Sequence, residues 1–224
     1  MTEGEVAKVI PSRVGRRIEI EIRARIARRK SRKSRKRFPP RTRGPLRTYE
    51  RGFSMNAIVV VDQNWAIGRE GRLLFNLPGD MRRFKELTEG GVIIMGRRTL
   101  NSFVEGHPLP DRRNIVVTRN KDLCPPEVEV VPDTGAALEA VAQEDPEKVW
   151  VIGGGSVYAA LLSRCRRAYL TRVETVAEVE PDTYFPNLDH LPGWEIEETG
   201  EPITENEVTY RFVRYINRNL DSAS

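Results

Sequence analysis

The chain has 224 residues, which is enough for one large domain or for a domain with an appendage, and its net charge at pH 7 is +5. Cys124 and Cys165 are too few cysteines for a disulfide framework, and two histidines without a cysteine cluster do not indicate a metal site. No apolar run approaches the roughly 20 residues that a membrane-spanning helix needs. We therefore expect a cytoplasmic protein with two reduced thiols, no metal and no membrane partner.

The positive charge is confined to the first 54 residues. They contain 18 Lys and Arg against 5 Asp and Glu, a net charge of +13, whereas the remainder carries 19 against 27, a net charge of −8. Because such a segment buries little apolar surface, residues 1–54 are predicted to be a disordered extension. Alternatively, the segment could bind nucleic acid or an anionic membrane, or it could be a targeting peptide. A further alternative is that it is not translated, because synthesis begins at Met55. A nucleic-acid partner is expected only if the extension is real and functional, and we expect a monomer.

From Met55 onward, strands alternate with helices. The apolar run at 57–61 predicts a buried strand, and helix 78–88 follows, because Pro78 opens a segment with apolar residues at helical spacing. The later elements are predicted in the order strand 91–95, a short helix after Arg97, strand 114–118, a short strand near 128–131, helix 134–143, strand 148–152, helix 155–163, strand 168–173, and strands 194–199 and 208–216. This order is typical of an α/β domain, here residues 55–220, with a mostly parallel sheet, helices on both faces and an antiparallel C-terminal edge.

Asp80 stands in the first turn of the predicted helix, in the stretch NLPGDMRRFK. Its position alone allows two interpretations. A carboxylate at a helix start is favoured by the helix dipole, so Asp80 could be an ordinary exposed residue. Alternatively, it is turned into a pocket to hold a ligand.

Two predicted strand-to-helix junctions contain glycine: IIMGRRT at Gly96 and VIGGGSVY at 153–155. Ligands of α/β sheets collect at such junctions, where glycine lets the backbone approach and free amides favour phosphate oxygens. The second junction is not the standard dinucleotide fingerprint, because Tyr158 occupies the place of its third glycine. Arg97 and Arg98 would suit the 2′-phosphate of NADP, although structural turns and solvated arginines explain each feature taken singly.

Seven blocks at matching spacing together resemble dihydrofolate reductase, from Met55 to about Asn217. They are AIVVVDQNWAIG, LLFNLPGDMRRFK, IIMGRRT, LPDRRNIVVT, VIGGGSVY, YLTRV and PDTYFP. The resemblance implies a dihydrofolate reductase-like fold with a central, mostly parallel, eight-stranded sheet. It also implies reduction of 7,8-dihydrofolate to 5,6,7,8-tetrahydrofolate, with hydride passing from NADPH to carbon 6 and a proton reaching nitrogen 5.

On matching positions the resemblance implies that Asp80 and Thr171 are the catalytic pair. Asp80 would accept two hydrogen bonds from the pterin, Thr171 would hydrogen-bond that carboxylate, and burial would raise the pKa of Asp80. The direct proton donor to nitrogen 5 is left open between a water and Asp80. The implied substrate site comprises Val60, Phe75, Asp80, Met81, Phe84, Phe103, Arg112, Ile152 and Thr171. The implied NADPH site comprises Ala66, Ile67, Gly96, Arg97, Arg98, Thr99, Thr118, Arg119, Ile152, Gly153, Gly154, Gly155, Ser156, Val157 and Tyr158.

Further roles follow from the same matches. Arg112 would bind the α-carboxylate of the glutamate tail of folate, and the adjacent Arg113 is expected to be exposed. The segment 64–77 would be a mobile loop that closes over the nicotinamide and excludes water.

Three features depart from the family pattern. Leu74 and Phe75 stand where the family often has Pro-Trp, which removes an indole N–H from the pocket wall. Trp65 is larger than expected at a loop position and could alter loop closure, and two extra residues around 104–105 lengthen a turn.

Two other readings remain. The pyrimidine reductase of riboflavin synthesis shares the fold and the NADPH turn, but Asp80 and Arg112 argue against its ribityl phosphate substrate. A nucleic-acid-binding protein with an inert body would rest on the basic extension alone, and an enzyme with a tethering arm would combine both activities.

Overall fold

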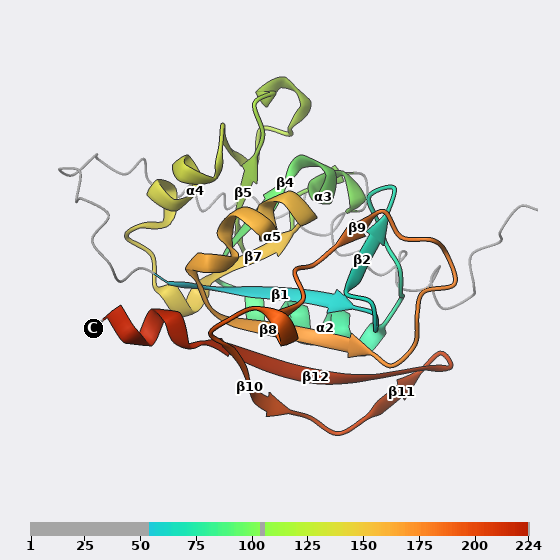
Figure 1. Ribbon diagram of the computed structural model, residues 1–224. Helices are drawn as coiled ribbons and strands as arrows, with labels where there is room; N and C mark the ends of the chain where they lie inside the picture. Colours follow the sequence, from blue (N-terminus) through green and yellow to red (C-terminus); the bar gives the residue numbers. More distant parts are fainter. Residues whose placement is uncertain (1–53, 104–105, 224) are drawn as a thin grey trace, which may run out of the picture. The chain divides into compact units, whose positions relative to one another are not determined.

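The computed structural model describes residues 54–103 and 106–223 (Figure 1). The predictions made for residues 1–53 and for the lengthened turn at 104–105 lie outside the described residues. Within them, no helix is long and apolar enough to cross a membrane.

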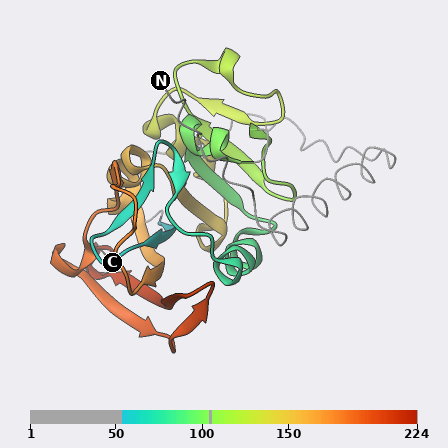
Figure 2. The same ribbon diagram turned by 90° about the vertical axis from the view of Figure 1, so that its right-hand side faces the viewer.

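A nine-stranded sheet forms the centre of the domain, in the order β10-β12-β8-β1-β7-β4-β5-β6, with β11 also paired to β12. The strands from β8 to β6 are parallel to their neighbours, whereas β12 is antiparallel to β8, β10 and β11. Their bounds are β1 Met55–Val61, β4 Val92–Gly96, β5 Arg113–Val117, β6 Glu129–Val131, β7 Val149–Gly153, β8 Cys165–Val173, β10 Trp194–Thr199, β11 Ile203–Glu205 and β12 Val208–Asn217. Figure 2 shows the orange and red C-terminal strands at one edge of this sheet and green strands toward the other.

The mostly parallel sheet and its antiparallel C-terminal edge confirm the predicted fold class. One strand more than the predicted eight is present because the outermost strand is interrupted after Thr199. Both of its pieces, β10 and β11, pair with β12.

Helices cover both faces of the sheet, as predicted. Along β1, Ala57 and Val59 belong to one core cluster and Ile58 belongs to another, because successive side chains of a strand point to opposite faces. Helices α4 (Thr134–Val141) and α5 (Gly155–Leu161) pack into the first cluster. Helix α2 (Pro78–Thr88) packs Phe84 and Leu87 against the second, to which α3 (Arg97–Ser102) contributes Leu100.

A second, three-stranded sheet was not predicted. It contains β3 (Arg72–Leu73), β2 (Ala66–Arg69) and β9 (Thr183–Tyr184), in that order, so it occupies part of the segment predicted to be a mobile loop. Strands of two to four residues are too short to produce a recognisable alternation of apolar and polar residues. The closing movement of this segment stays a prediction.

Trp65 anchors the start of that segment. Its side chain is only 5% exposed and stacks on Phe185, with ring centres 6.4 Å apart. Asp62 fixes the preceding turn, because its Oδ1 accepts hydrogen bonds from the amides of Asn64 at 2.8 Å and Ala66 at 2.9 Å. The unusual tryptophan is therefore part of the core and not part of an open loop.

Most element boundaries agree with prediction within two residues. The largest difference is β8, which begins at Cys165 and not at residue 168. The first residues of β8 were not predicted as strand, because the charged side chains of Arg166 and Arg167 interrupt the apolar pattern. Arg167 is accommodated by Glu197 of β10, with its Nε 3.0 Å from the carboxylate Oε2. Short 3-10 helices that the sequence did not indicate are Lys121–Leu123, Pro146–Lys148, Leu162–Arg164, Leu188–His190 and Arg218–Ala223.

Candidate active site

Asp80 reaches its position because α2 starts at an unusual cap. Pro78 suits the first helical turn, since its fixed φ is already helical and it lacks the N–H that would remain unsatisfied there. The preceding Leu77 gives no side-chain cap. Instead, the amide of Gly79 donates a hydrogen bond to Oε2 of Glu205 in β11, at 2.7 Å. A carboxylate from the far end of the chain thus fixes the start of the helix that carries Asp80.

The Asp80 carboxylate is buried and has one hydrogen-bonding side chain. Only 8% of the residue is exposed, and the hydroxyl of Thr171 in β8, itself 1% exposed, donates to Oδ1 at 2.6 Å. Burial raises the pKa of Asp80, while the Thr171 hydroxyl and the positive charge of Arg83 oppose the rise and the negative charge of Glu205 adds to it. The inward orientation and the raised pKa agree with what the family resemblance implied for Asp80.

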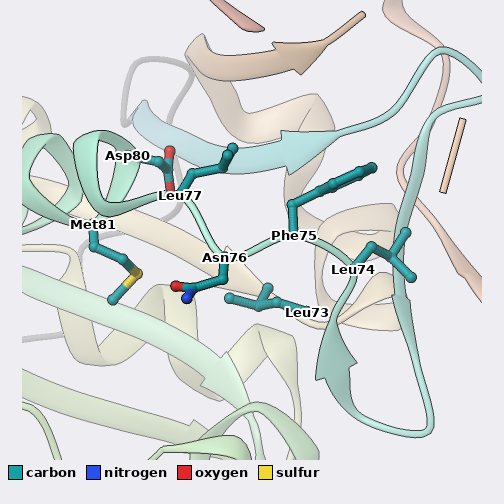
Figure 3. A pocket seen from close by; sticks show the side chains of 7 residues that line it. All are labelled: Leu73, Leu74, Phe75, Asn76, Leu77, Asp80 and Met81. Carbon is teal, nitrogen blue, oxygen red and sulfur yellow. The ribbon is translucent and has the colours of Figure 1, made fainter. Parts of the chain in front are cut away.

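A cavity of about 300 Å³ opens beside Asp80 (Figure 3). It is lined by Leu73, Leu74, Phe75, Asn76, Leu77, Asp80 and Met81. Figure 3 shows Asp80 and Leu77 side by side at the first turn of α2, with Phe75 further back along the preceding loop. Leu73 is 63% exposed and Met81 is 51% exposed, so the outer wall faces solvent. A mostly apolar wall with one carboxylate suits a flat ligand that presents N–H donors on one edge.

The other predicted substrate residues lie around this region in two groups. Phe84, Phe103 and Ile152 pack together against the second core cluster. Val60 and Phe75 pack against a third cluster, which contains Leu77, Val173 and Tyr210. The structure therefore brings most of the predicted substrate residues to α2 and the sheet face beneath it.

Arg112 is held rigidly at the C-terminal end of α2. Its Nε donates to the hydroxyl of Thr88 at 2.8 Å and its Nη1 donates to the carbonyl of Pro110 at 2.7 Å. Its guanidinium carbon lies 5.8 Å from the centre of the Phe84 ring. The side chain is half-buried, and burial lowers its pKa.

The expectation that Arg113 is exposed is wrong. Its side chain is half-buried between Glu129, at 2.7 Å, and Glu144, at 2.9 Å. These ion pairs connect the start of β5 to β6 and the end of α4, so Arg113 supports the fold.

The two glycine junctions adjoin each other, because β4 and β7 are paired neighbours with Met95 opposite Gly153. A Cβ atom on Gly96 would lie 3.8 Å from the Gly154 amide nitrogen, and one on Gly154 would lie 3.4 Å from the Thr99 hydroxyl. Gly153 has φ +116°, a conformation that favours glycine, and the peptide bond between Gly153 and Gly154 is cis. The backbones of the two junctions thus approach each other closely.

The side chains around these junctions differ in exposure. Arg98, Arg119 and Ser156 are exposed, and Arg97, Thr99, Thr118, Gly155 and Ile152 are half-buried. Ala66, Ile67 and Val157 are buried. Because α3 has six residues and α5 has seven, their dipoles are small, so attraction of an anion must come mainly from arginine side chains.

Tyr158 has a structural contact that the sequence did not reveal. Its hydroxyl donates to the carbonyl of Ile58 in β1 at 2.6 Å, and its ring meets Phe185 edge-on with centres 4.8 Å apart. Burial raises the pKa of Tyr158 above its usual range, so the hydroxyl stays protonated. The hydroxyl therefore ties α5 to β1.

Three residues near Asp80 were missed. Arg83 and Glu205 act on it electrostatically, and the hydroxyl of Tyr210 donates to Oε2 of Glu205 at 3.1 Å. The helical spacing from Asp80 to Arg83 was a usable signal, since residues three apart lie on the same side of a helix. Nothing in the sequence indicated Glu205 or Tyr210, because they come from distant strands.

The fold and these features are those of an α/β enzyme, with an apolar cavity beside a buried carboxylate and two glycine-containing strand-to-helix junctions. Residues 54–217 match the family model described as dihydrofolate reductase, and the chain belongs to this family of oxidoreductases of folate metabolism.

Relatives agree with this assignment. The chain is 39% identical over 160 residues to dihydrofolate reductase type 3 of Salmonella typhimurium, covering 71% of this chain and 95% of that protein. It is 36% identical over 168 residues to dihydrofolate reductase of Bacillus subtilis, covering 74% and 96%. It is also 35% identical over 191 residues to the bifunctional dihydrofolate reductase-thymidylate synthase of Daucus carota, covering 77% of this chain but only 34% of that longer protein.

Proposed function

We propose that the chain reduces 7,8-dihydrofolate to 5,6,7,8-tetrahydrofolate with NADPH, by hydride transfer to carbon 6 and protonation at nitrogen 5. The observation that carries this proposal is the buried Asp80 carboxylate, which accepts a hydrogen bond from Thr171 and lines a mostly apolar cavity. Membership of the dihydrofolate reductase family supports the same reaction.

Asp80 would orient the pterin. A carboxylate can accept the amino group and the neighbouring ring N–H of a pterin edge together, which fixes the plane and direction of the ring. The Thr171 hydroxyl bonds Oδ1 and so limits rotation of the carboxylate. Phe84 and Phe103 would pack against the aminobenzoyl ring, and Arg112 would bind the glutamate carboxylate as an already oriented guanidinium.

Asp80 would also promote protonation at nitrogen 5. Its raised pKa leaves a larger fraction of the carboxyl protonated near neutral pH than an exposed aspartate has. The proton would pass either directly or through a water that Asp80 orients. In both cases the chain supplies a proton at the pterin side of the cavity.

The residues at the glycine junctions fit NADPH. Side chains at positions 96, 154 and 155 would fill the space near Val157, Thr99 and Thr183 that the backbone leaves free. Arg97 and Arg98 would pair with phosphate oxygens, and Ala66 and Ile67 provide buried apolar surface suited to a nicotinamide ring. NADPH bound there supplies the hydride for carbon 6.

Substrate competition in the full-length chain tests the proposal. We expect rapid oxidation of NADPH with 7,8-dihydrofolate as substrate and slower oxidation of NADH with the same substrate. NADPH should not be oxidised when a pyrimidine that carries a ribityl phosphate replaces dihydrofolate. Turnover of the pyrimidine and not of dihydrofolate would contradict the proposal and would assign Asp80 a different role.

We further propose that residues 55–220 form the catalytic domain and that the basic residues 1–54 are not needed for chemistry. A protein that begins at Met55 should then retain kcat and KM, and a large loss of kcat would contradict this. The cytoplasmic location and the monomeric state stay predictions.

A further inference from the structure

Arg83 is a charged residue on the inner side of α2, three residues after Asp80. Its guanidinium carbon lies 4.1 Å from the centre of the Phe212 ring and 5.7 Å from that of Tyr169. Its Nη1 is inaccessible to water and has no hydrogen-bond partner among the described residues. An arginine stays protonated even when burial lowers its pKa, as it does here, so a full positive charge lies between helix and sheet.

Phe212 links this charge to the catalytic carboxylate. On the paired strands β12 and β8, Phe212 lies directly opposite Thr171, the residue that hydrogen-bonds Asp80. The guanidinium therefore stacks over the immediate neighbour of Thr171 but makes no hydrogen bond to Asp80 itself. In such a poorly solvated place, a charge acts on another over a longer distance than in water.

Glu205 places an opposite charge near the same carboxylate. The Gly79 amide at 2.7 Å, the Tyr210 hydroxyl at 3.1 Å and the Arg82 guanidinium at 3.2 Å all donate to it. These donors hold the pKa of Glu205 below its usual range, so it is ionised at neutral pH. Like charges repel, which makes ionisation of Asp80 harder.

We propose that Arg83 and Glu205 are positioning residues that set the protonation of Asp80 in opposite directions, Arg83 favouring the carboxylate and Glu205 favouring the neutral acid. This proposal rests on the proposed function only for its effect on turnover, because the protonation of Asp80 is a property of the ligand-free protein.

The remaining groups around Asp80 do not compete for this role. Thr171 donates a hydrogen bond but carries no charge. The Tyr158 hydroxyl donates to the Ile58 carbonyl and the Tyr210 hydroxyl donates to Glu205, and burial raises the pKa of both hydroxyls, that of Tyr210 to about 12. Both are therefore neutral over the pH range in which Asp80 titrates.

The test is a carbon-13 NMR titration of the Asp80 carboxyl in the ligand-free, full-length protein, with its signal assigned by Asp80→Asn. Arg83→Met keeps an unbranched side chain over Phe212 without the charge, and it should raise the pKa of Asp80 by about one unit. Glu205→Gln keeps an acceptor for the Gly79 amide and should lower that pKa. The double variant should lie between the two single variants.

Two further variants separate charge from structure. Arg83→Lys retains the charge and should titrate near the wild type. Arg211 precedes Phe212 in the chain, but its guanidinium pairs with Glu174 at 2.7 Å. Arg211→Met therefore removes a nearby charge and should not change the titration of Asp80. The proposal would be overturned if Arg83→Met and Glu205→Gln shifted the pKa of Asp80 in the same direction, or if Arg83→Met left it unchanged.

If Arg83→Met fails to fold, Glu205→Gln and Arg83→Lys still decide: an upward or absent shift in Glu205→Gln overturns the proposal. The alkaline limb of the pH profile of kcat/KM should move with the NMR titration. If the titrations shift as expected but no variant turns over dihydrofolate, the electrostatic proposal holds and the proposed function fails.

Discussion

Removing the hydroxyl that bonds Asp80 gives a prediction with a defined pH dependence. Thr171→Val keeps the shape of the side chain but deletes the donor that lies 2.6 Å from Oδ1. A hydrogen bond to a charged group contributes about 1.5–3 kcal/mol, against about 1 kcal/mol between neutral groups. The difference of about 1 kcal/mol or more should raise the pKa of Asp80 by about one unit.

The sign of the effect on stability follows by linkage. The pKa of Asp80 in the folded protein is already raised, so the ionised carboxylate disfavours the fold above that pKa, and this cost disappears as the pH falls toward 3.8, the ordinary pKa of an aspartate. Thr171→Val increases the cost of ionising the carboxyl, which applies only while the carboxylate is charged. At low pH the variant loses only a hydrogen bond between neutral groups. We therefore expect a loss of about 1.5–3 kcal/mol in the free energy of unfolding at about pH 8, and about 1 kcal/mol at about pH 4.

Urea denaturation of the two proteins at both pH values measures these losses. The matched control is Thr209→Val, because the Thr209 hydroxyl lies 2.9 Å from the hydroxyl of Thr204 in an exposed, uncharged pair. Its small loss should not depend on pH. Equal losses for Thr171→Val at both pH values would refute the idea that its hydroxyl bonds a charged carboxylate.

Three further predictions concern the same site. Asp80→Asn should increase the free energy of unfolding near pH 7 by about 1.4 kcal/mol for each unit by which the pKa is raised, and the gain should vanish toward pH 4 in the same denaturation assay. Arg112→Ala should weaken dihydrofolate binding by about 10- to 100-fold and leave NADPH binding nearly unchanged in equilibrium titrations, and equal losses for both ligands would remove Arg112 from the glutamate site. Gly153→Ala should destabilise the fold by about 1–3 kcal/mol and weaken NADPH binding, because φ is +116° there and a Cβ would lie 3.1 Å from the Tyr158 ring; calorimetry that finds neither loss would contradict the proposed cradle.

The local pattern of the sequence was sufficient to predict α2 and its carboxylate. Pro78 and the apolar repeat predicted the start and extent of the helix, and the structure has α2 at the predicted residues 78–88. Of the repeat, Phe84 and Leu87 pack inward, whereas Met81 is exposed. The inward turn of Asp80 did not follow from that pattern, since a helix-start carboxylate is usually exposed. It followed from the resemblance to a known family.

The residues that surround Asp80 were harder to predict because they come from distant parts of the chain. Glu205 accepts a hydrogen bond from the amide of Gly79, 126 residues earlier in the first turn of α2, a contact with no local signature. Arg83 looked like one of several surface charges, although it packs on Phe212. Trp65 looked anomalous for a loop until its stacking on Phe185 showed that it belongs to the core.

The most direct test of the account is the rate of NADPH oxidation with 7,8-dihydrofolate by the full-length protein and by Asp80→Asn, with Glu86→Gln as the control. Glu86 is an exposed acid on the same helix, so its neutral variant changes the net charge equally. We predict that Asp80→Asn lowers kcat/KM by about 100-fold or more while remaining folded, and that Glu86→Gln keeps the wild-type rate. Wild-type turnover by a folded Asp80→Asn would contradict the role of the buried carboxylate on which the account depends.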